Sequence, residues 1–265
     1  MNQAILDEII NQDYAQITRR IENFLQIQIS QNNSNGIILG MSGGIDSAVI
    51  AYLCARQLKE KTHALIMPDT DITPKTETED ALSMIKTLGI DYKLIDIKPI
   101  INSYSKYLEP NDWAMGNLRA RVRTNILYYY ANAANYLVAG SSDKSEHLIG
   151  YFTKFGDGAS DIVPIISLYK LQIRKIAQFL GIPENVIEKK SSPHLWKEHA
   201  AEKEIGVSYE EIDSILYCLF DKQLSPDDTS KETEIPIHTV QKIYELHKSS
   251  EHKRESSVRP FGDKL

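Results

Sequence analysis

The chain alternates between segments with helical spacing of apolar residues and short, continuous apolar runs. Residues 5–29 carry apolar side chains three or four positions apart, which predicts one amphipathic helix. The apolar runs that follow are bounded by glycine and polar residues, as is typical of buried parallel strands. We predict strands at the following positions: 36–40, 62–67, 92–97 and 136–140, with a candidate fifth strand at 162–166.

Helical spacing returns between these strands, at 46–58, 76–88 and 113–135. Strands that alternate with helices form parallel βαβ units, so the fold class is α/β, a single-domain open parallel sheet flanked by helices. After residue 171 the pattern is mostly helical, and the polar segment 221–234 is interpreted as a solvated connector. Ligands of such sheets bind at the carboxyl ends of the strands, where Gly40 and Gly140 lie.

Composition narrows the class of protein. The 265 residues suit one domain spanning 1–265, and the 42% hydrophobic and 25% charged content is that of a globular protein. No basic and apolar leader opens the chain and no apolar run approaches the ~20 residues of a membrane helix, which indicates a cytoplasmic protein. The net charge of −6 disfavours nucleic acid as a partner, so small substrates are expected.

A loop of small residues follows the first predicted strand. Its backbone N–H groups and the start of the next helix form a cradle for phosphate. It is no Walker A loop, because the Gly-Lys-[Ser/Thr] ending is missing. A carboxylate beside bound phosphates is best explained as a ligand of Mg²⁺. The loop consists of Gly40, Met41, Ser42, Gly43, Gly44, Ile45, Asp46 and Ser47.

The alternative for this loop is an ordinary glycine-rich turn in which Asp46 and Ser47 only cap a helix. The full string Ser-Gly-Gly-Ile-Asp-Ser disfavours that interpretation. The string resembles the signature of N-type ATP pyrophosphatases, which form adenylates and release pyrophosphate. The resemblance implies that the loop binds ATP and cleaves it between the α- and β-phosphates.

A second block carries further candidate chemistry. Glu146 follows the strand end at Gly140, so it and Asp46 could share one magnesium ion, although a surface glutamate on a helix would have the same sequence. Lys154, Asp157 and Asp161 lie in a glycine-containing stretch whose mixed charge is consistent with either a substrate clamp or a solvated loop.

This block, residues 140–146 and 150–164, resembles NAD synthetases, in particular the ammonia-dependent ones. Further similar stretches bring the resemblance to most of the chain from 36 to 254. It implies an adenine-nucleotide α-hydrolase-like, Rossmann-like fold, and a homodimer. It also implies that Asp46 and Glu146 hold Mg²⁺, and that Ser141 and Lys170 bind ATP. The residues that match contacts to nicotinate adenine dinucleotide (deamido-NAD) are Arg121, Lys154, Asp161, His252 and Lys253.

The chain departs from the family pattern at Ala200, where a threonine usually helps to hold ATP. Ser191, Ser192 or His199 could substitute, because one lost hydrogen bond costs roughly 0.5–1.5 kcal/mol and does not abolish function. We expect a mobile lid at about 190–206. We also expect the tail at about 249–265 to contact substrate and to be ordered when substrate is bound.

The implied reaction amidates deamido-NAD to NAD with ATP and ammonia, through an adenylated carboxylate. Asp46 and Lys170 are the residues to which catalysis is assigned, and no residue is identified as the base for ammonium. Three alternatives stay open. The preferred acid could be nicotinate mononucleotide, the chain could be a tRNA-modifying adenylating enzyme, or it could be a non-catalytic nucleotide-binding module. Free ammonia is the expected donor, because no glutaminase nucleophile is found.

Overall fold

A four-stranded parallel sheet forms the centre of the computed structural model, which describes residues 1–192, 195–196 and 200–255. Its strands lie in the order β3-β2-β1-β4, and β1 is paired in parallel with β2 on one side and with β4 on the other. Gly40 faces Leu65 in this register, and Leu39 faces Ala139. The strands are β1 (Gly36–Gly40), β2 (Thr62–Ile66), β3 (Asp91–Leu94) and β4 (Tyr136–Ala139).

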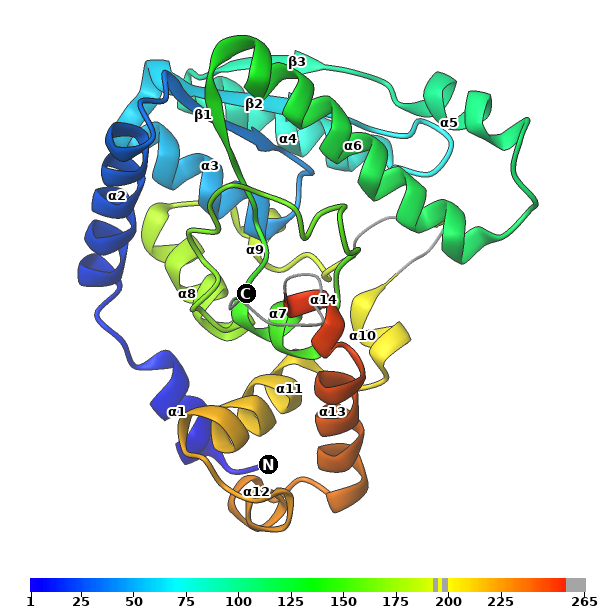
Figure 1. Ribbon diagram of the computed structural model, residues 1–265. Coiled ribbons are helices and arrows are strands. Elements are labelled where there is room, and N and C mark those ends of the chain that lie inside the picture. The colour runs from blue at the N-terminus through cyan, green and yellow to red at the C-terminus, as the bar shows by residue number, and fades with distance from the viewer. Residues whose placement is uncertain (193–194, 197–199, 256–265) are drawn as a thin grey trace, which may run out of the picture.

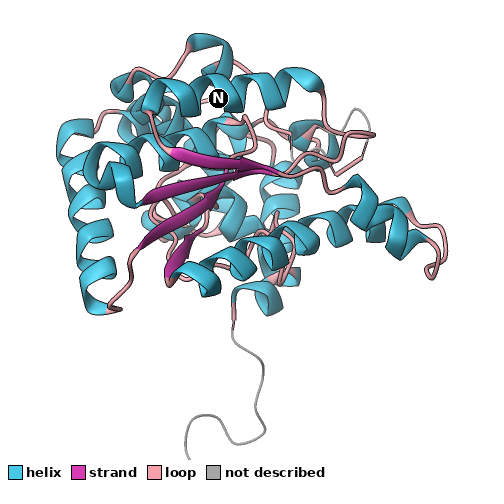
Figure 2. Ribbon diagram, turned by 90° about the horizontal axis from the view of Figure 1, so that it is seen from above, coloured by secondary structure: helices cyan, strands magenta, loops and turns pink. Residues whose placement is uncertain are grey.

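Helices cover both faces of this sheet, as Figure 2 shows from above. Side chains alternate across a strand, so Ile37 and Leu39 belong to the core under α2, α3, α4 and α8, whereas Ile38 belongs to the core under α5 and α6. The flanking helices are α2 (Tyr14–Gln31), α3 (Ile45–Leu58), α4 (Lys75–Leu88), α5 (Lys98–Ser105), α6 (Asp112–Ala134) and α8 (Lys170–Leu180).

Most of the remaining helices gather around a third core beside the sheet, in the lower part of Figure 1. Tyr209 is fully buried in this core. The elements around it are α1 (Gln3–Ile10), α7 (Lys144–Ile149), α10 (Ala201–Ile205), α11 (Tyr209–Leu216), the π-helical turn η2 (Tyr217–Asp221), α12 (Pro226–Thr233), α13 (Ile237–Ser249) and α14 (Glu251–Arg254). The short helix α9 (Glu184–Ile187) belongs instead to the core that contains Ile37 and Leu39, and a 3-10 turn, η1 (Lys59–Lys61), precedes β2.

The predicted α/β fold with an open parallel sheet is confirmed, but the single helix predicted for 5–29 is wrong. Two helices occupy it, because Asn11 ends α1 and Asp13 begins α2 by accepting a hydrogen bond from Gln16 N at 2.9 Å. The two helices pack in different cores. Spacing of apolar residues alone does not reveal this change of direction.

Two further expectations are corrected. The candidate fifth strand reduces to one bridge between Ala139 and Ile162, since the chain turns away directly afterwards. The segment 221–234 is not simply a connector, because it contains α12, whose Thr229 and Thr233 side chains are buried. Within the described part of the chain, no helix is both long and apolar enough to cross a membrane.

Candidate active site

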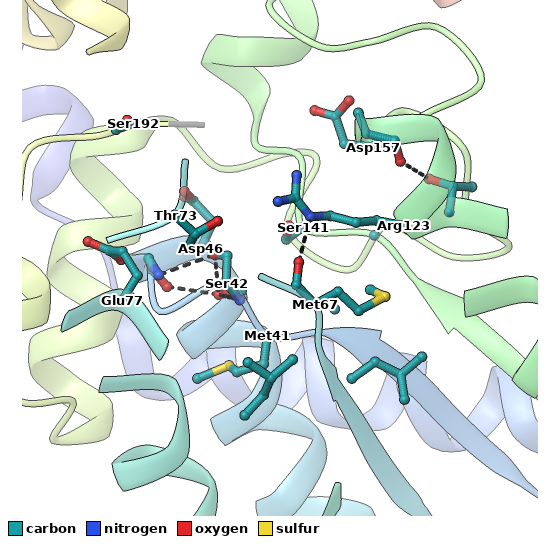
Figure 3. Close-up of a pocket in the computed structure, with 18 of the residues that line it drawn as sticks. Met41, Ser42, Asp46, Met67, Thr73, Glu77, Arg123, Ser141, Asp157 and Ser192 are labelled. Carbon is teal, nitrogen blue, oxygen red and sulfur yellow. Dashed lines mark hydrogen bonds between the residues drawn. The ribbon is translucent and has the colours of Figure 1, made fainter. Parts of the chain in front are cut away.

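The site lies where the order of the strands reverses. The chain passes from β1 to β2 on one side, and β4 later joins β1 on the other, which opens a crevice at the carboxyl ends of β1 and β4. A cavity of about 260 Å³ occupies this crevice, and Gly40 and Gly140 both line it. Figure 3 shows the residues around it.

The predicted phosphate loop forms one wall of the cavity, and its two serines brace it. Ser47 Oγ accepts a hydrogen bond from Ser42 N at 3.2 Å and donates to the Gly44 carbonyl at 3.0 Å. Gly43 has φ +90°, and a Cβ there would lie 2.3 Å from the Glu77 carbonyl oxygen. Only glycine fits this position, because it needs a left-handed backbone and leaves no room for a side chain.

Helix α3 begins within this loop, at Ile45, with Gly44 as its N-cap and no hydrogen bond from a capping side chain. Asp46 and Ser47 therefore do not cap the helix, which removes the basis of the ordinary-turn interpretation. A helix start without a side-chain cap presents N–H groups and the positive end of the helix dipole to an anion.

Lys170 lies at the centre of a group of charges behind the loop. Its Nζ is 2.8 Å from Asp46 Oδ1, 2.9 Å from Asp143 Oδ2 and 3.0 Å from Glu146 Oε1. The Lys170 side chain is 1% exposed, whereas those of Asp46 and Glu146 are each 18% exposed and line the cavity. The structure thus brings together three residues predicted from far-separated motifs, and adds Asp143.

Sequence reasoning missed Asp143, although a carboxylate three residues before Glu146 was a signal. Its second oxygen, Oδ1, accepts a hydrogen bond from Glu146 N at 2.7 Å and so caps α7. One buried carboxylate therefore orients both the lysine and the neighbouring glutamate.

Burial and charge act against each other in this group. Burial raises the pKa of Glu146 well above its usual value, more than the nearby Lys170 lowers it, and burial likewise raises the pKa of Asp143. Burial would lower the pKa of Lys170, but the surrounding carboxylates raise it well above its usual value. The ammonium is therefore permanently charged at neutral pH.

Asp213 and Ser145 hold the start of α8, and with it Lys170. Ser145 Oγ accepts from Lys170 N at 2.9 Å and donates to Asp213 Oδ1 at 2.5 Å. Asp213 Oδ2 accepts from Leu171 N at 2.8 Å. Burial is the main cause that raises the pKa of Asp213, to about 7.

Two cations on the cavity wall were not expected from the sequence. Lys189 Nζ lies 3.0 Å from Glu77 and 2.7 Å from Asp80, and donates to the Gly43 carbonyl. Arg123, in the middle of α6, donates from Nε to the Met67 carbonyl at 2.9 Å. Neither lies in a recognisable motif, so tertiary packing alone identifies them.

The residues predicted to bind deamido-NAD lie outside the described lining of the cavity. Arg121 donates to the Lys154 carbonyl, Lys154 Nζ donates to the His252 carbonyl, and Lys253 Nζ donates to the Gly150 and Phe152 carbonyls at 2.8 Å. These four therefore form one cluster between α6, the loop after α7 and α14.

Asp161 stands apart from that cluster. Its carboxylate accepts from Val138 N at 2.8 Å and from the Tyr128 hydroxyl at 3.1 Å. In this structure it therefore ties the chain after β4 to the strand itself and to α6.

The predicted lid is described in part. Ser191 and Ser192 line the cavity, whereas Ala200 is the N-cap of α10 and does not belong to the described lining. The backbone N–H of Ala201 donates to the Ser191 carbonyl at 3.0 Å. His199 lies outside the described residues, as does the part of the tail from 256 onward.

Across the described chain, no group of three His, Cys, Asp or Glu side chains is arranged to hold a metal ion. The carboxylates of Asp46 and Glu146 nevertheless face the same space, since both contact one nitrogen of Lys170. Two carboxylates completed by phosphate oxygens and water are a common way to bind Mg²⁺.

Comparison with known proteins agrees with this geometry. The NAD synthase family model matches residues 17–257. The NH3-dependent NAD(+) synthetase of Hyperthermus butylicus is 49% identical over 258 residues, 96% of this chain and 94% of the relative.

Two solved structures share the fold along nearly their whole length. The NH3-dependent NAD synthetase of Campylobacter jejuni matches with a TM-score of 0.80 and 34% identity, and the NMN synthetase of Francisella tularensis with a TM-score of 0.83 and 32% identity. Each comparison covers 94% of this chain and 99% of the other. The chain therefore belongs to the NAD synthase family and is an enzyme of that family.

Proposed function

We propose that this chain amidates deamido-NAD to NAD, with ammonia as the nitrogen donor and ATP as the source of energy. The observation that carries the proposal is the single cavity in which the phosphate loop meets Asp46 and Glu146, with Lys170 directly behind them. The names of the relatives from Hyperthermus and Campylobacter agree with this reaction.

The reaction needs ATP because a carboxylate does not react with ammonia. In the first step an oxygen of the nicotinate carboxylate bonds to the α-phosphorus, and the bond to the bridging oxygen breaks, so that its electron pair leaves with pyrophosphate. In the second step ammonia attacks the acyl carbon, AMP leaves and a proton is released. The loop and Lys170 would stabilise the charge of the leaving pyrophosphate.

Asp46 and Glu146 are the residues that would hold Mg²⁺. A divalent cation would favour the ionised form of the carboxylates around Lys170, which number three against the single ammonium of the lysine. A bound Mg²⁺ would neutralise phosphate charge. Lys170, kept in place by Asp143, lies directly behind the carboxylates of Asp46 and Glu146 and would orient them and add positive charge beneath the phosphates.

Deamido-NAD would be held by Arg121, Lys154, Asp161, His252 and Lys253. Support comes from the cluster that four of them form, in which the side chains of Arg121, Lys154 and Lys253 donate to backbone carbonyls, one of them that of His252. Substrate groups would compete for the same donors. We also propose that 190–206 is the lid, that Ser191 or Ser192 replaces the hydroxyl missing at Ala200, and that the tail from 249 contacts substrate.

Nicotinate mononucleotide is the second candidate acid. It is favoured by the likeness to the structure titled NMN synthetase from Francisella tularensis. The deciding experiment measures AMP and pyrophosphate formation with each acid and ammonium chloride, and compares kcat/KM. A higher value for the mononucleotide would overturn the dinucleotide assignment, and equal use of glutamine by the purified chain would overturn the choice of ammonia. Asp46→Ala should form no AMP with either acid.

A homodimer is proposed from the surface of α5 and α6. An apolar groove between them is lined by Ile95, Ile100, Tyr104, Val122, Asn125, Ile126, Tyr129 and Tyr130. Tyr129 is 69% exposed and Trp113, on the same helix, is 65% exposed. Exposed apolar patches of this kind are typical of protein interfaces, and a second copy of the chain would cover this one.

A further inference from the structure

Arg123 differs from the other basic side chains at the crevice. Lys170 has three carboxylates within 3.0 Å and Lys189 has two, whereas Lys190, which also lines the cavity, is exposed to solvent. Arg123 lines the cavity and forms no ion pair with any residue from the described ranges. Its single hydrogen bond to these residues runs from Nε to the Met67 carbonyl.

This hydrogen bond fixes the guanidinium at the end of β2 and leaves its terminal nitrogens directed into the cavity. Figure 3 shows them pointing into the space between Asp46 on one side and Asp157 on the other, next to Ser141. Asp157 lies on the loop that also carries Lys154. The guanidinium thus lies between the phosphate loop and the loop proposed to bind the acid.

The negative charge of the cavity lining makes a cation necessary for binding an anionic ligand. The lining contains four carboxylates, those of Asp46, Glu77, Glu146 and Asp157, so a polyanionic nucleotide would be repelled without compensation. Burial lowers the pKa of Arg123 to about 10, which still leaves the side chain charged at neutral pH. The planar fork of a guanidinium binds two oxygens of one phosphate, and it does so more strongly in a partly desolvated site.

We propose that Arg123 is a catalytic residue whose guanidinium donates to one non-bridging oxygen of the α-phosphate of ATP. This proposal rests on the proposed function. As the carboxylate oxygen bonds to the α-phosphorus and pyrophosphate departs, negative charge on this oxygen increases, and the guanidinium stabilises it. The same contact holds the phosphate of the acyl adenylate until ammonia displaces AMP.

The test compares wild type, Arg123→Met and Arg123→Lys in AMP formation with deamido-NAD. Removing a donor that stabilises the transition state typically lowers kcat by about 100-fold or more, so Arg123→Met should lose roughly that factor. Arg123→Lys keeps the charge but loses the fork, and should lie between the two. The matched control is Arg56→Met, because Arg56 pairs with Glu22 at the far end of α3.

The decisive measurement uses the two epimers of ATP that carry sulfur on the α-phosphate. If Arg123 contacts one non-bridging oxygen, wild type and Arg56→Met will react more slowly with the epimer that places sulfur there. In Arg123→Met the disfavoured epimer should gain about tenfold in rate relative to the other epimer. The reason is that this variant has no contact with the oxygen that sulfur could weaken. Arg123→Lys supplies the comparison if the methionine variant does not fold by circular dichroism.

Two outcomes would overturn the proposal: a wild-type rate in Arg123→Met, or a loss of rate with the wild-type ratio of epimers. The second would mean that Arg123 only supports the fold. Failure of the proposed function has a different signature, since the wild-type chain itself would then form no AMP in response to deamido-NAD.

Discussion

Lys170 combines burial, three ion pairs and a position behind the phosphate loop. Removing its charge leaves Asp46, Asp143 and Glu146 facing one another without compensation. We expect Lys170→Met to lower the free energy of unfolding by roughly 3–5 kcal/mol at pH 8, as is usual when one partner of a buried ion pair is removed. Urea titration measures this, and AMP formation should be lost at the same time.

Lys175→Met is the control, because Lys175 is an exposed lysine one turn later on the same helix. It should change stability by less than about 0.5 kcal/mol. Adding Asp143→Asn to Lys170→Met should restore part of the lost stability, since one uncompensated carboxylate is removed. If the double variant were no more stable than the single one, the repulsion between carboxylates would not be the cause.

Gly43→Ala tests the close contact between the loop and α4. The new methyl group would lie 2.3 Å from the Glu77 carbonyl and also force a left-handed backbone on alanine, so the loop must move. We expect a loss of more than about 3 kcal/mol in stability or at least a tenfold rise in the KM for ATP.

Gly181→Ala separates these two causes. Gly181 also has a positive φ, of +74°, but nothing lies within 4 Å of an added Cβ. Its substitution should cost only the backbone strain, about 1–2 kcal/mol, with an unchanged KM for ATP. Equal effects of both substitutions would show that the contact with Glu77 is unimportant.

The sequence allowed the prediction of the phosphate loop, because a loop between a strand and a helix carries its spacing in the linear pattern. Lys170 was assigned only through the resemblance to the family, since a lysine on a helix has no such local signal. It did not allow the prediction of Arg123 or Lys189. Both are single basic residues outside any motif, and their meaning depends on which groups the fold places beside them. The assigned roles of Ser141 and Arg121 stay predictions that mutation must test.

At the scale of elements, Asp213 joins α11 to the starts of α7 and α8. Its pKa of about 7 lies above the value of an unfolded chain, so the folded state binds the proton more tightly. This contribution to stability is full at low pH and is lost as the pH rises from about 4 to about 7. Between pH 5 and pH 8 the loss should be about 2.5 kcal/mol.

Comparison with Asp213→Asn isolates this effect, because asparagine does not titrate. Wild type should lose stability relative to the variant between pH 5 and pH 8 in urea titrations. Glu211→Gln, which removes a carboxylate from the same helix, is the control substitution. A constant difference between wild type and Asp213→Asn would contradict the prediction.

Elements were predicted best where tight turns bound them. The helical range predicted at 76–88 ends where Gly89 takes a left-handed conformation after α4, and Asn135 does the same after α6. The structure of residues 5–29 and 221–234 was predicted wrongly, because tertiary packing rather than local spacing determines which helices form there. The polar composition of α12 gives no apolar spacing from which a helix could be predicted. Its buried positions are threonines, Thr229 and Thr233, and the Thr233 hydroxyl donates to the Thr229 carbonyl.

At the scale of the whole molecule, the apolar face of α5 and α6 predicts self-association. Tyr129→Glu places a charge in the centre of the exposed face and should convert a dimer to a monomer in light scattering, with little change in melting temperature. Tyr244→Glu, on α13 away from the groove, is the control. A wild-type chain that is monomeric at high micromolar concentration would contradict the prediction.

The order of the strands has a consequence for how the protein acquires its structure. Lys170 is 124 residues from Asp46 in the chain, and β4 lies about one hundred residues after its partner β1. Contacts between such distant segments form late in folding, because the entropy of closing a long loop must be overcome first. The nucleotide site is therefore among the last parts of a newly made chain to be completed. ATP should accordingly slow unfolding of the finished protein without accelerating its folding.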